Sequence, residues 1–232
     1  MGTAMFDLVM FDLDGTLVET APEIADAVND LLGELGLPTV GEDLVKNWIG
    51  HGTRELMTHA YAHAAQIDID TVRRTGTMDK LMPRVAPYYE RRCGTRSRLY
   101  PDVLDTLRAL RERDVRLAVV TNKEARFTMP ILLAQNIRHF FDLVVAGDSL
   151  AAKKPDPLPV QHCLDKFGVS RERALFVGDS QLDVQAARAA GVAVWAVPYG
   201  YNMGQPVADS HPDRMIATMA ALGDAVRQAC PA

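Results

Sequence analysis

This sequence has no long hydrophobic run. Its first apolar stretch covers residues 8–11, has Asp7 beside it and follows no Lys or Arg. A signal peptide needs an apolar region of about 7–15 residues behind a basic start, and a membrane-spanning helix needs about 20 apolar residues. No other segment approaches that length, so we expect neither a signal peptide nor a membrane partner.

A basic excess is also missing, and cysteine is scarce. The 232 residues include 25 Lys and Arg against 30 Asp and Glu, a formal net charge of -5. Such a chain is not drawn to nucleic acid or anionic lipid, so a small diffusing molecule is the expected partner. Cys93, Cys163 and Cys230 are odd in number and far apart, which favours free thiols in a reducing cytoplasm over a disulfide framework. We expect Cys163 to pack on a helix.

Short apolar runs rich in valine are present instead, and they recur along the chain. They cover residues 8–11, 117–120, 143–146, 174–177 and 192–197. Continuous apolar runs of this length suit strands that are buried on both faces, as in a parallel sheet. Helical spacing separates them, for example at Val103, Leu107 and Leu110. The alternation predicts an α/β fold with a Rossmann-like, doubly wound parallel sheet.

One long interval, about residues 19–97, lacks any strand run. Helical spacing recurs within it, at the apolar residues 24, 28, 31 and 35 and again at residues 81, 85 and 88, which Arg92 continues. We therefore predict an all-helical cap domain at residues 19–95, inserted in a Rossmann-like core formed by residues 1–18 and 96–232. The connecting segments near residues 17–20 and 94–100 are candidate hinges.

Polar residues follow the predicted strands at their carboxyl ends, where open α/β sheets bind ligands. They are Asp12, Asp14, Thr121, Asn122, Asp148, Asp179 and Asp183, with Lys153 and Lys154 in the loop after the third run. Asp12 and Asp14 stand about 6.6 Å apart in an extended strand, and at an effective dielectric of 20 their carboxylates repel by about 2.5 kcal/mol. Either a cation lies near these acids, or one of them is protonated.

A magnesium ion would answer this repulsion, because Mg²⁺ takes oxygen ligands and combines few carboxylates with a substrate phosphate. Thr121 and Lys154 could then hold phosphate oxygens. Backbone N–H groups around Gly15 and Thr16 would be free to do the same. The set is suited to phosphoryl transfer.

Four motifs carry a resemblance to a known family. They are DLDGT at 12–16, TN at 121–122, KPDP at 154–157 and GDSQLD at 178–183. In this order, and over essentially the whole chain, they resemble the haloacid dehalogenase superfamily. The resemblance implies that Asp12 is the nucleophile that forms an aspartyl-phosphate and that Asp14 is the general acid/base. It places Mg²⁺ on the Asp12 side chain, the Asp14 carbonyl and Asp179, with Asp183 in support.

The residue at position 14 separates branches of this superfamily. The dehalogenases have an aromatic residue there and the P-type ATPases a Thr, whereas Asp14 resembles the phosphatases and phosphomutases. An Asp can protonate the leaving alkoxide and then activate water, so dehalogenation is disfavoured. Softer signatures, WIGHG at 48–52, TNK at 121–123 and YGYN at 199–202, are similar to the phosphoglycolate phosphatase family. This likeness implies hydrolysis of 2-phosphoglycolate.

The helical insert resembles the cap of that family, which closes over the site and excludes water. Its loop would face the end of the substrate that lacks the phosphate. His51 and Arg54 are therefore candidate substrate contacts, with Arg54 as a cation for a carboxylate. Thr16 and Asn122 are candidate contacts on the core side. His51 could equally be a solvated loop residue.

Several alternatives remain open. The substrate could be a sugar phosphate, a nucleotide or pyrophosphate, or the enzyme could be a phosphomutase similar to β-phosphoglucomutase. A noncatalytic binding module is disfavoured because neither the nucleophile nor a metal ligand is lost. Lys154 is favoured over Lys153 only by the Pro155 that follows it. His59 and His63 have the spacing of zinc ligands, but no third ligand is evident. The protein could be a monomer or a homodimer.

Overall fold

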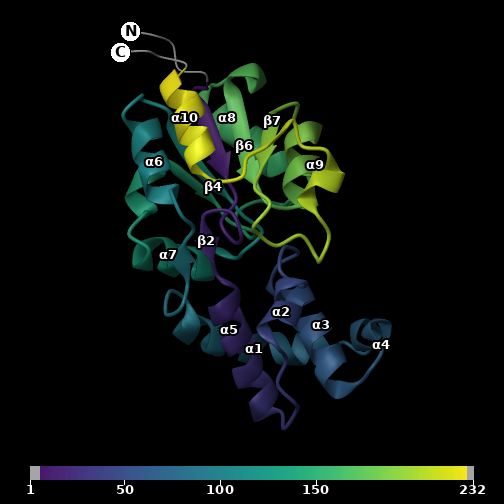
Figure 1. Cartoon of the computed structure of the whole chain (residues 1–232). Helices are drawn as coiled ribbons and strands as arrows, with labels where there is room; N and C mark the ends of the chain where they lie inside the picture. Colours follow the sequence, from purple (N-terminus) through teal and green to yellow (C-terminus); the bar gives the residue numbers. More distant parts are fainter. Residues whose placement is uncertain (1–5, 229–232) are drawn as a thin grey trace.

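Six parallel strands form the central sheet, in the order β5-β4-β1-β6-β7-β8 (Figure 1). The computed structural model describes residues 6–228. The strands are β1 (Leu8–Phe11), β4 (Arg116–Val120), β5 (Leu143–Val145), β6 (Ala174–Gly178), β7 (Ala193–Ala196) and β8 (Arg214–Met215). Each of the five valine-rich runs is therefore a strand, and the predicted α/β class with a parallel sheet is confirmed.

The sixth strand, β8, has no counterpart in the sequence pattern. It is two residues long, lies at the edge of the sheet beside β7, and both of its residues are exposed. A strand this short, with Arg214 as half of it, leaves neither an apolar run nor an alternation to detect.

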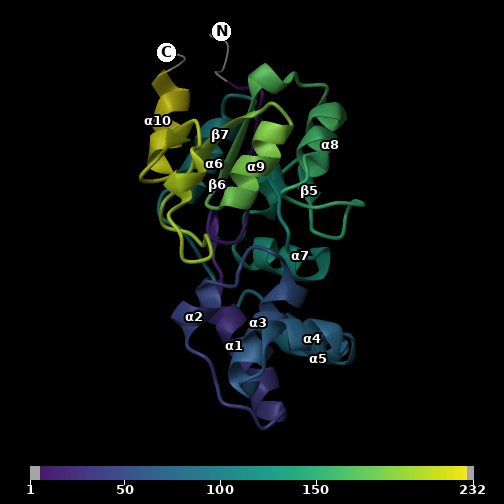
Figure 2. The same ribbon diagram turned by 90° about the vertical axis from the view of Figure 1, so that its right-hand side faces the viewer.

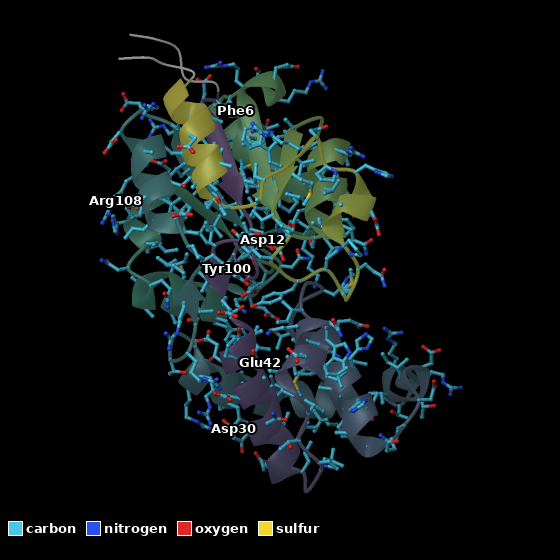
Figure 3. All side chains as sticks on the ribbon, in the orientation of Figure 1. Phe6, Asp12, Asp30, Glu42, Tyr100 and Arg108 are labelled. Atoms are coloured by element: carbon cyan, nitrogen blue, oxygen red, sulfur yellow. The ribbon has the colours of Figure 1, made fainter. Side chains whose placement is uncertain are left out.

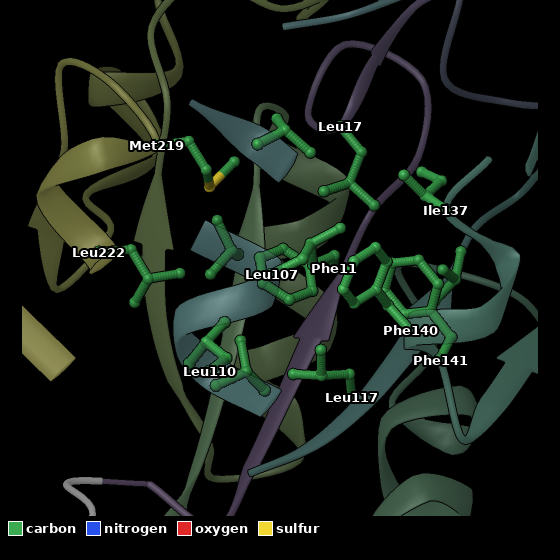
Figure 4. Close-up of a cluster of buried hydrophobic side chains, with 14 of the residues drawn as sticks. Phe11, Leu17, Leu107, Leu110, Leu117, Ile137, Phe140, Phe141, Met219 and Leu222 are labelled. Carbon is green, nitrogen blue, oxygen red and sulfur yellow. The ribbon is translucent and has the colours of Figure 1, made fainter. Parts of the chain in front are cut away.

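Side chains of successive strand residues point to opposite faces of the sheet, and each face has its own hydrophobic core. Val9 and Phe11 of β1 pack on one face, where Leu107, Leu110 and other residues of the helices complete the cluster (Figure 4). The helices on this face are α6 (Val103–Arg111), α7 (Ala125–Ala134) and α10 (Ala220–Gln228). Burial on both faces explains why β1 reads as a continuous apolar run.

The other face is covered by α8 (Leu158–Phe167) and α9 (Gln181–Ala189). Leu8 and Met10 of β1 contribute to this second cluster together with Cys163 of α8, which is fully buried as expected. Cys93 and Cys163 are free thiols, and Cys230 lies outside the described residues. Helices on both faces make the sheet doubly wound. Three 3₁₀ turns, η1 (Arg138–Phe140), η2 (Arg171–Arg173) and η3 (Val207–Ser210), complete this part of the chain.

Five consecutive helices occupy the interval in which the sequence has no strand run. They are α1 (Ala21–Glu34), α2 (Glu42–Lys46), α3 (Thr53–Ala65), α4 (Ile69–Arg74) and α5 (Thr77–Arg92). They share a third hydrophobic cluster and lie together beyond the carboxyl end of the sheet (Figures 1 and 2). We refer to α1–α5 as the helical insert. None of the described helices is both long and apolar enough to cross a membrane.

The two segments that connect the helical insert to the sheet pair with each other. Strand β2 (Val18–Glu19) runs antiparallel to β3 (Arg98–Leu99), with Val18 opposite Leu99. The candidate hinges therefore form one short ribbon rather than two independent loops.

Candidate active site

The carboxyl ends of the central strands meet at the edge of the sheet that faces the helical insert. Thr121 follows β4, Asp12 follows β1 and Asp179 follows β6, and these three strands are neighbours in the sheet. Figure 3 shows Asp12 at this boundary. Lys154 reaches the same place from the loop between β5 and α8, and all four residues are buried. The topology thus brings together side chains that are far apart in the sequence.

Lys154 pairs with two of the buried acids. Its Nζ lies 2.8 Å from Asp12 Oδ1 and 2.7 Å from Asp183 Oδ1. Burial acts against the charge on Lys154, but Asp12 and Asp183 outweigh it, so the pKa of Lys154 is raised. Burial also raises the pKa of Asp12 to about 7, although Lys154 acts in the opposite direction. One lysine therefore does not compensate all the acids at this edge.

Asp12, Asp179 and Asp183 form an acidic cluster. One carboxylate oxygen of each lies within 4.8 Å of the others. Oδ1 of Asp12 is buried, and its partner is the ammonium group of Lys154, 2.8 Å away. Burial, together with Asp12 and Asp183, holds the pKa of Asp179 well above its ordinary value. Buried carboxylates that repel one another are stabilised by a hard divalent cation, so this donor set fits Mg²⁺.

Within the cluster, the hydrogen bonds of Asp183 suit a supporting role. Its Oδ2 accepts from Asp179 N at 3.2 Å, Ser180 N at 3.0 Å and Ser180 Oγ at 2.7 Å. The bond from Ser180 N is one half of a capping box at the start of α9, in which the Ser180 side chain accepts from Asp183 N in return, and Oδ1 accepts from Lys154 Nζ. Both oxygens of Asp183 are therefore engaged by protein groups.

Hydrogen bonds from two loops, one with Thr16 and one with Tyr201, orient the carboxylate of Asp179. Thr16 Oγ1 donates to Oδ1 and the backbone N–H of Tyr201 to Oδ2, each at 2.5 Å. Gly15 has a φ of +87°, and a Cβ at this position would lie 2.2 Å from Asp179 Oδ2. Only glycine allows the loop after β1 to pass so close to this carboxylate.

The side chain of Asp14 lies apart from the acidic cluster. Its Oδ1 accepts from Thr20 Oγ1 at 2.6 Å, and its Oδ2 lies 3.0 Å from Nζ of Lys123. Nζ of Lys123 also donates to the hydroxyl of Tyr89, which belongs to α5 of the helical insert. The two acids of the DLDGT motif therefore have different surroundings. Asp12 faces the acidic cluster and Asp14 faces a lysine.

A cavity of about 50 Å³ lies between these residues and the helical insert. Its floor includes Asp12, Asp14, Thr121, Asn122 and Lys154. Its opposite wall is mostly apolar and includes Ile24, Val28, Leu56, Met57 and Val85. A small polar ligand could contact the acids and cations on one side while the insert keeps water away from the other.

Comparison with known proteins identifies the family. The sequence model of the haloacid dehalogenase-like hydrolases matches residues 9–197. The chain belongs to this family. Curated phosphoglycolate phosphatases from Nitrosospira multiformis and Mannheimia succiniciproducens are similar, with 41% identity (91% of each chain covered) and 42% identity (94% of this chain and 97% of the relative).

A solved structure with the same fold is similar in sequence as well. The crystal structure of a predicted phosphoglycolate phosphatase from Haemophilus somnus superposes with a TM-score of 0.87 at 38% identity, covering 95% of this chain and 98% of that chain. Membership in the haloacid dehalogenase-like hydrolases therefore agrees with the fold, and residues of the motifs line one cavity, among them Asp12, Asp14, Thr121, Asn122 and Lys154.

Thr16 and Asn122, the predicted substrate contacts on the core side of the hydrolase, have different positions relative to the cavity. The expectation of free N–H groups at Gly15 and Thr16 is wrong, because Gly15 N donates to Val18 O at 3.0 Å and Thr16 N to Leu13 O at 3.4 Å. Thr16 does not line the cavity, since its side chain is bound to Asp179. Asn122 does line it, and its Nδ2 donates to Lys154 O at 2.8 Å and to Gly50 O at 3.0 Å.

The loop of the helical insert places His51 and Arg54 outside the cavity. Arg54 pairs with Asp79 at 2.9 Å, and its side chain is 57% exposed. Nε2 of His51 lies 2.9 Å from Sδ of Met203, and neither His51 nor Arg54 lines the cavity. Arg54 is therefore not positioned to bind a substrate carboxylate in this arrangement, and the cation that lines the cavity near Asp14 is a different residue, Lys123.

The side chains of the neighbouring residues Lys153 and Lys154 contact different parts of the protein. Lys153 is exposed and its Nζ donates to His51 O at 2.7 Å, so it contacts the helical insert. Asp148, the remaining acid after a strand, accepts from Ala125 N at 2.8 Å and does not line the cavity. Of these strand-end residues, Lys154 alone reaches Asp12.

Tyr89 and Lys123 line the cavity, although the sequence pattern does not predict them as site residues. Tyr89, rather than Tyr88, faces inward from α5, one position away from the expected helix face. Lys123 is the third residue of the TNK signature, and its role was not recognised because a lysine in a loop is usually solvated. The signal that could have found it is its place directly after Thr121 and Asn122, at the end of a central strand.

Proposed function

We propose that this hydrolase is a Mg²⁺-dependent phosphatase that cleaves 2-phosphoglycolate to glycolate and phosphate. The observation that carries the proposal is the buried Asp12, which is next to Lys154 and within a cluster of acids, while Asp14 lies apart. The curated relatives at 41–42% identity that bear the name phosphoglycolate phosphatase support this choice among small phosphoesters. We propose that it acts in the cytoplasm on a small phosphorylated metabolite.

In the first step, a carboxylate oxygen of Asp12 attacks the phosphorus of the substrate. The bond between phosphorus and the ester oxygen breaks, and the ester oxygen leaves with the electron pair. Asp14, in its protonated form, gives its proton to that oxygen, so glycolate leaves as an alcohol. Asp12 now holds the phosphoryl group, and Asp14 is ionised.

In the second step, Asp14 takes a proton from a water molecule that attacks the phosphorus. The bond between phosphorus and Asp12 breaks, and the electron pair returns to the carboxylate of Asp12. Inorganic phosphate leaves, and both acids regain their starting states. The contacts with Lys123 Nζ and Thr20 Oγ1 orient the side chain of Asp14 for both proton transfers.

The carboxylates of Asp12 and Asp179 and the carbonyl of Asp14 would hold Mg²⁺, with Asp183 orienting the neighbouring groups. The bound ion would neutralise negative charge on Asp12 and on the phosphate. Lys154 and the hydroxyl of Thr121 would contact phosphate oxygens from the other side.

The test is phosphate release by the wild-type protein and D12N in the presence of Mg²⁺. The substrates are 2-phosphoglycolate, sugar phosphates, nucleotides and pyrophosphate. We expect the highest kcat/KM for 2-phosphoglycolate and no turnover by D12N, whereas D148N, which removes an acid that does not line the cavity, keeps its activity. Full turnover by D12N would contradict the mechanism. A higher kcat/KM for another ester would identify that ester as the substrate instead. Transfer of the phosphoryl group between two positions of a sugar would indicate a mutase.

A further inference from the structure

Lys123 is a cation that lines the cavity and pairs with Asp14, the proposed general acid/base. We propose that it selects substrates with a second anionic group, a carboxylate attached to the carbon that bears the ester oxygen. The inference rests on the proposed function and adds a specificity-determining residue to it. Four observations support it: the cations of the cavity, the partners of Lys123, its distance from Asp14 and the apolar side chains that line the cavity.

Among the described residues that line the cavity, the cations are Lys123 and Lys154. Lys154 is held between Asp12 and Asp183, at the end where the phosphoryl group binds. Arg54, the cation expected to bind a carboxylate, pairs with Asp79 at the surface. A second anionic group on the substrate therefore meets Lys123.

Lys123 has one hydrogen-bond donor left for such a group. An ammonium group has three N–H donors. Its partners are Asp14 Oδ2, 3.0 Å away, and the hydroxyl of Tyr89. Its side chain is only 5% exposed, and Nζ lies 4.7 Å from the ring centroid of Tyr89. That ring is fixed in turn against Phe127, with centroids 4.5 Å apart. The ammonium group is thus held in place before a ligand arrives.

The reach of Lys123 matches a short substrate. To protonate the ester oxygen, Asp14 must come within about 2.6–3.2 Å of it. Nζ of Lys123 lies 3.0 Å from Oδ2 of Asp14, so it is no more than two hydrogen-bond lengths from the ester oxygen. When the carboxylate is attached to the carbon that bears the ester oxygen, its oxygens are three bonds from the ester oxygen and fall within this range. A carboxylate several carbons farther along the substrate does not.

The apolar side chains that line the cavity strengthen this contact. Ile24, Val28 and Leu56 of the helical insert are among them. In such surroundings a charge pair is stronger than in water, and a neutral group opposite Lys123 would leave a buried donor without a partner. The cavity therefore discriminates against esters that are neutral at this end.

The experiment compares two substrates that differ only at that end. These are 2-phosphoglycolate and 2-hydroxyethyl phosphate, in which an alcohol replaces the carboxylate. We measure kcat and KM with Mg²⁺ for the wild-type protein, K123Q, K123R and K80Q. Lys80 is an exposed residue of α5, so K80Q removes the same charge from the surface. K123M provides a second uncharged side chain should K123Q not fold.

We expect the wild-type protein and K80Q to prefer 2-phosphoglycolate by about 10- to 100-fold in kcat/KM, the range of a hydrogen bond to a charged group. In K123Q the preference should fall towards one, mainly through a higher KM for 2-phosphoglycolate. K123R, which keeps the charge, should retain part of the preference for 2-phosphoglycolate. Any effect of Lys123 through Asp14 alone would lower kcat for both substrates equally.

Two results would overturn the inference. They are a wild-type protein that hydrolyses both esters equally well, and a K123Q variant whose preference is unchanged, whether its activity is kept or is lost equally on both substrates. The first does not depend on whether any variant folds. A wild-type protein that hydrolyses neither ester is a different outcome, since it defeats the proposed function and this inference with it.

Discussion

The carboxylate of Glu23 in α1 accepts the backbone N–H of Ser97 at 3.0 Å, across 74 positions of sequence. The same oxygen, Oε2, accepts from Gly94 N at 2.9 Å and Arg96 N at 3.4 Å. Glu23 is fully buried, and these three donors lie in the segment that returns from the helical insert to the sheet. One side chain thus attaches the end of the insert to its beginning.

Replacing Glu23 by Ala should therefore destabilise the protein by about 2–4 kcal/mol, because three backbone donors lose a common acceptor. E23Q should be less destabilised, since an amide oxygen can accept the same bonds. Chemical denaturation measures both. Glu90, an exposed acid of α5, gives the control E90A, which should change the free energy of unfolding by no more than about 0.5 kcal/mol. Equal stability of E23A and E90A would contradict the anchoring role.

Glu23 should also contribute to the pH dependence of stability. Burial raises its pKa above the ordinary 4.5, although the bonds from Ser97 act in the opposite direction. A raised pKa in the folded state means that the contribution of Glu23 is fully present below pH 4.5 and is lost as the pH rises through the folded pKa. We therefore expect the free energy of unfolding of the wild-type protein to fall relative to that of E23Q as pH increases from about 4.5. Parallel pH profiles would refute the expectation.

The acidic cluster predicts a stabilising effect of magnesium. An ion that binds only the folded state raises its stability, by about 2.7 kcal/mol at 100 times Kd. The melting temperature of the wild-type protein should therefore rise on addition of Mg²⁺ and fall with a chelator. D179N, which lacks a carboxylate of the cluster, should show a much smaller rise. D105N, which alters an exposed acid of α6, should respond like the wild-type protein. An equal rise in D179N would place the ion elsewhere.

The strands could be predicted because a strand that is buried on both faces is a continuous apolar run in the sequence. Val9, Phe11, Leu8 and Met10 are all apolar since the sheet is covered on both sides. The edge strand β8 and the β2–β3 ribbon have no such apolar run, because each of these strands is only two residues long and forms through pairing with its neighbour. Asp12, Asp179 and Lys154 were recognisable since each follows a strand or stands in a motif loop.

Contacts made by the helical insert were harder to predict. Arg54 looked available for a substrate carboxylate, but its partner Asp79 lies on another helix, and no spacing in the sequence links the two. Tyr89 was missed for a related reason. Both Tyr88 and Tyr89 fit an amphipathic helix, and packing against Phe127 of α7 decides between them. Such choices depend on how two elements meet in space, which local periodicity does not contain.

The separate surroundings of Asp14 predict a dependence on the leaving group. D14N should lower kcat for 2-phosphoglycolate by about 10²- to 10⁴-fold, the usual range for general acid/base catalysis. For p-nitrophenyl phosphate the loss in the first step should be much smaller, because nitrophenolate leaves without a proton. Burst kinetics, which separate formation of the phosphorylated enzyme from its hydrolysis, measure that step. Equal loss of the first step on both substrates would argue against Asp14 as the acid.

Lys154 and Lys153 are adjacent, and their substitution should have very different effects. K154Q leaves Asp12 and Asp183 buried without their cation, and breaking a buried pair in this way costs about 3–5 kcal/mol. It should also reduce kcat/KM by at least about 100-fold, because a charge on the phosphate loses its partner. K153Q removes an exposed lysine that contacts only the loop of the insert, so its free energy of unfolding should change by no more than about 0.5 kcal/mol. Phosphate release and denaturation measured on both variants decide the matter, and a larger activity loss in K153Q than in K154Q would reverse the assignment.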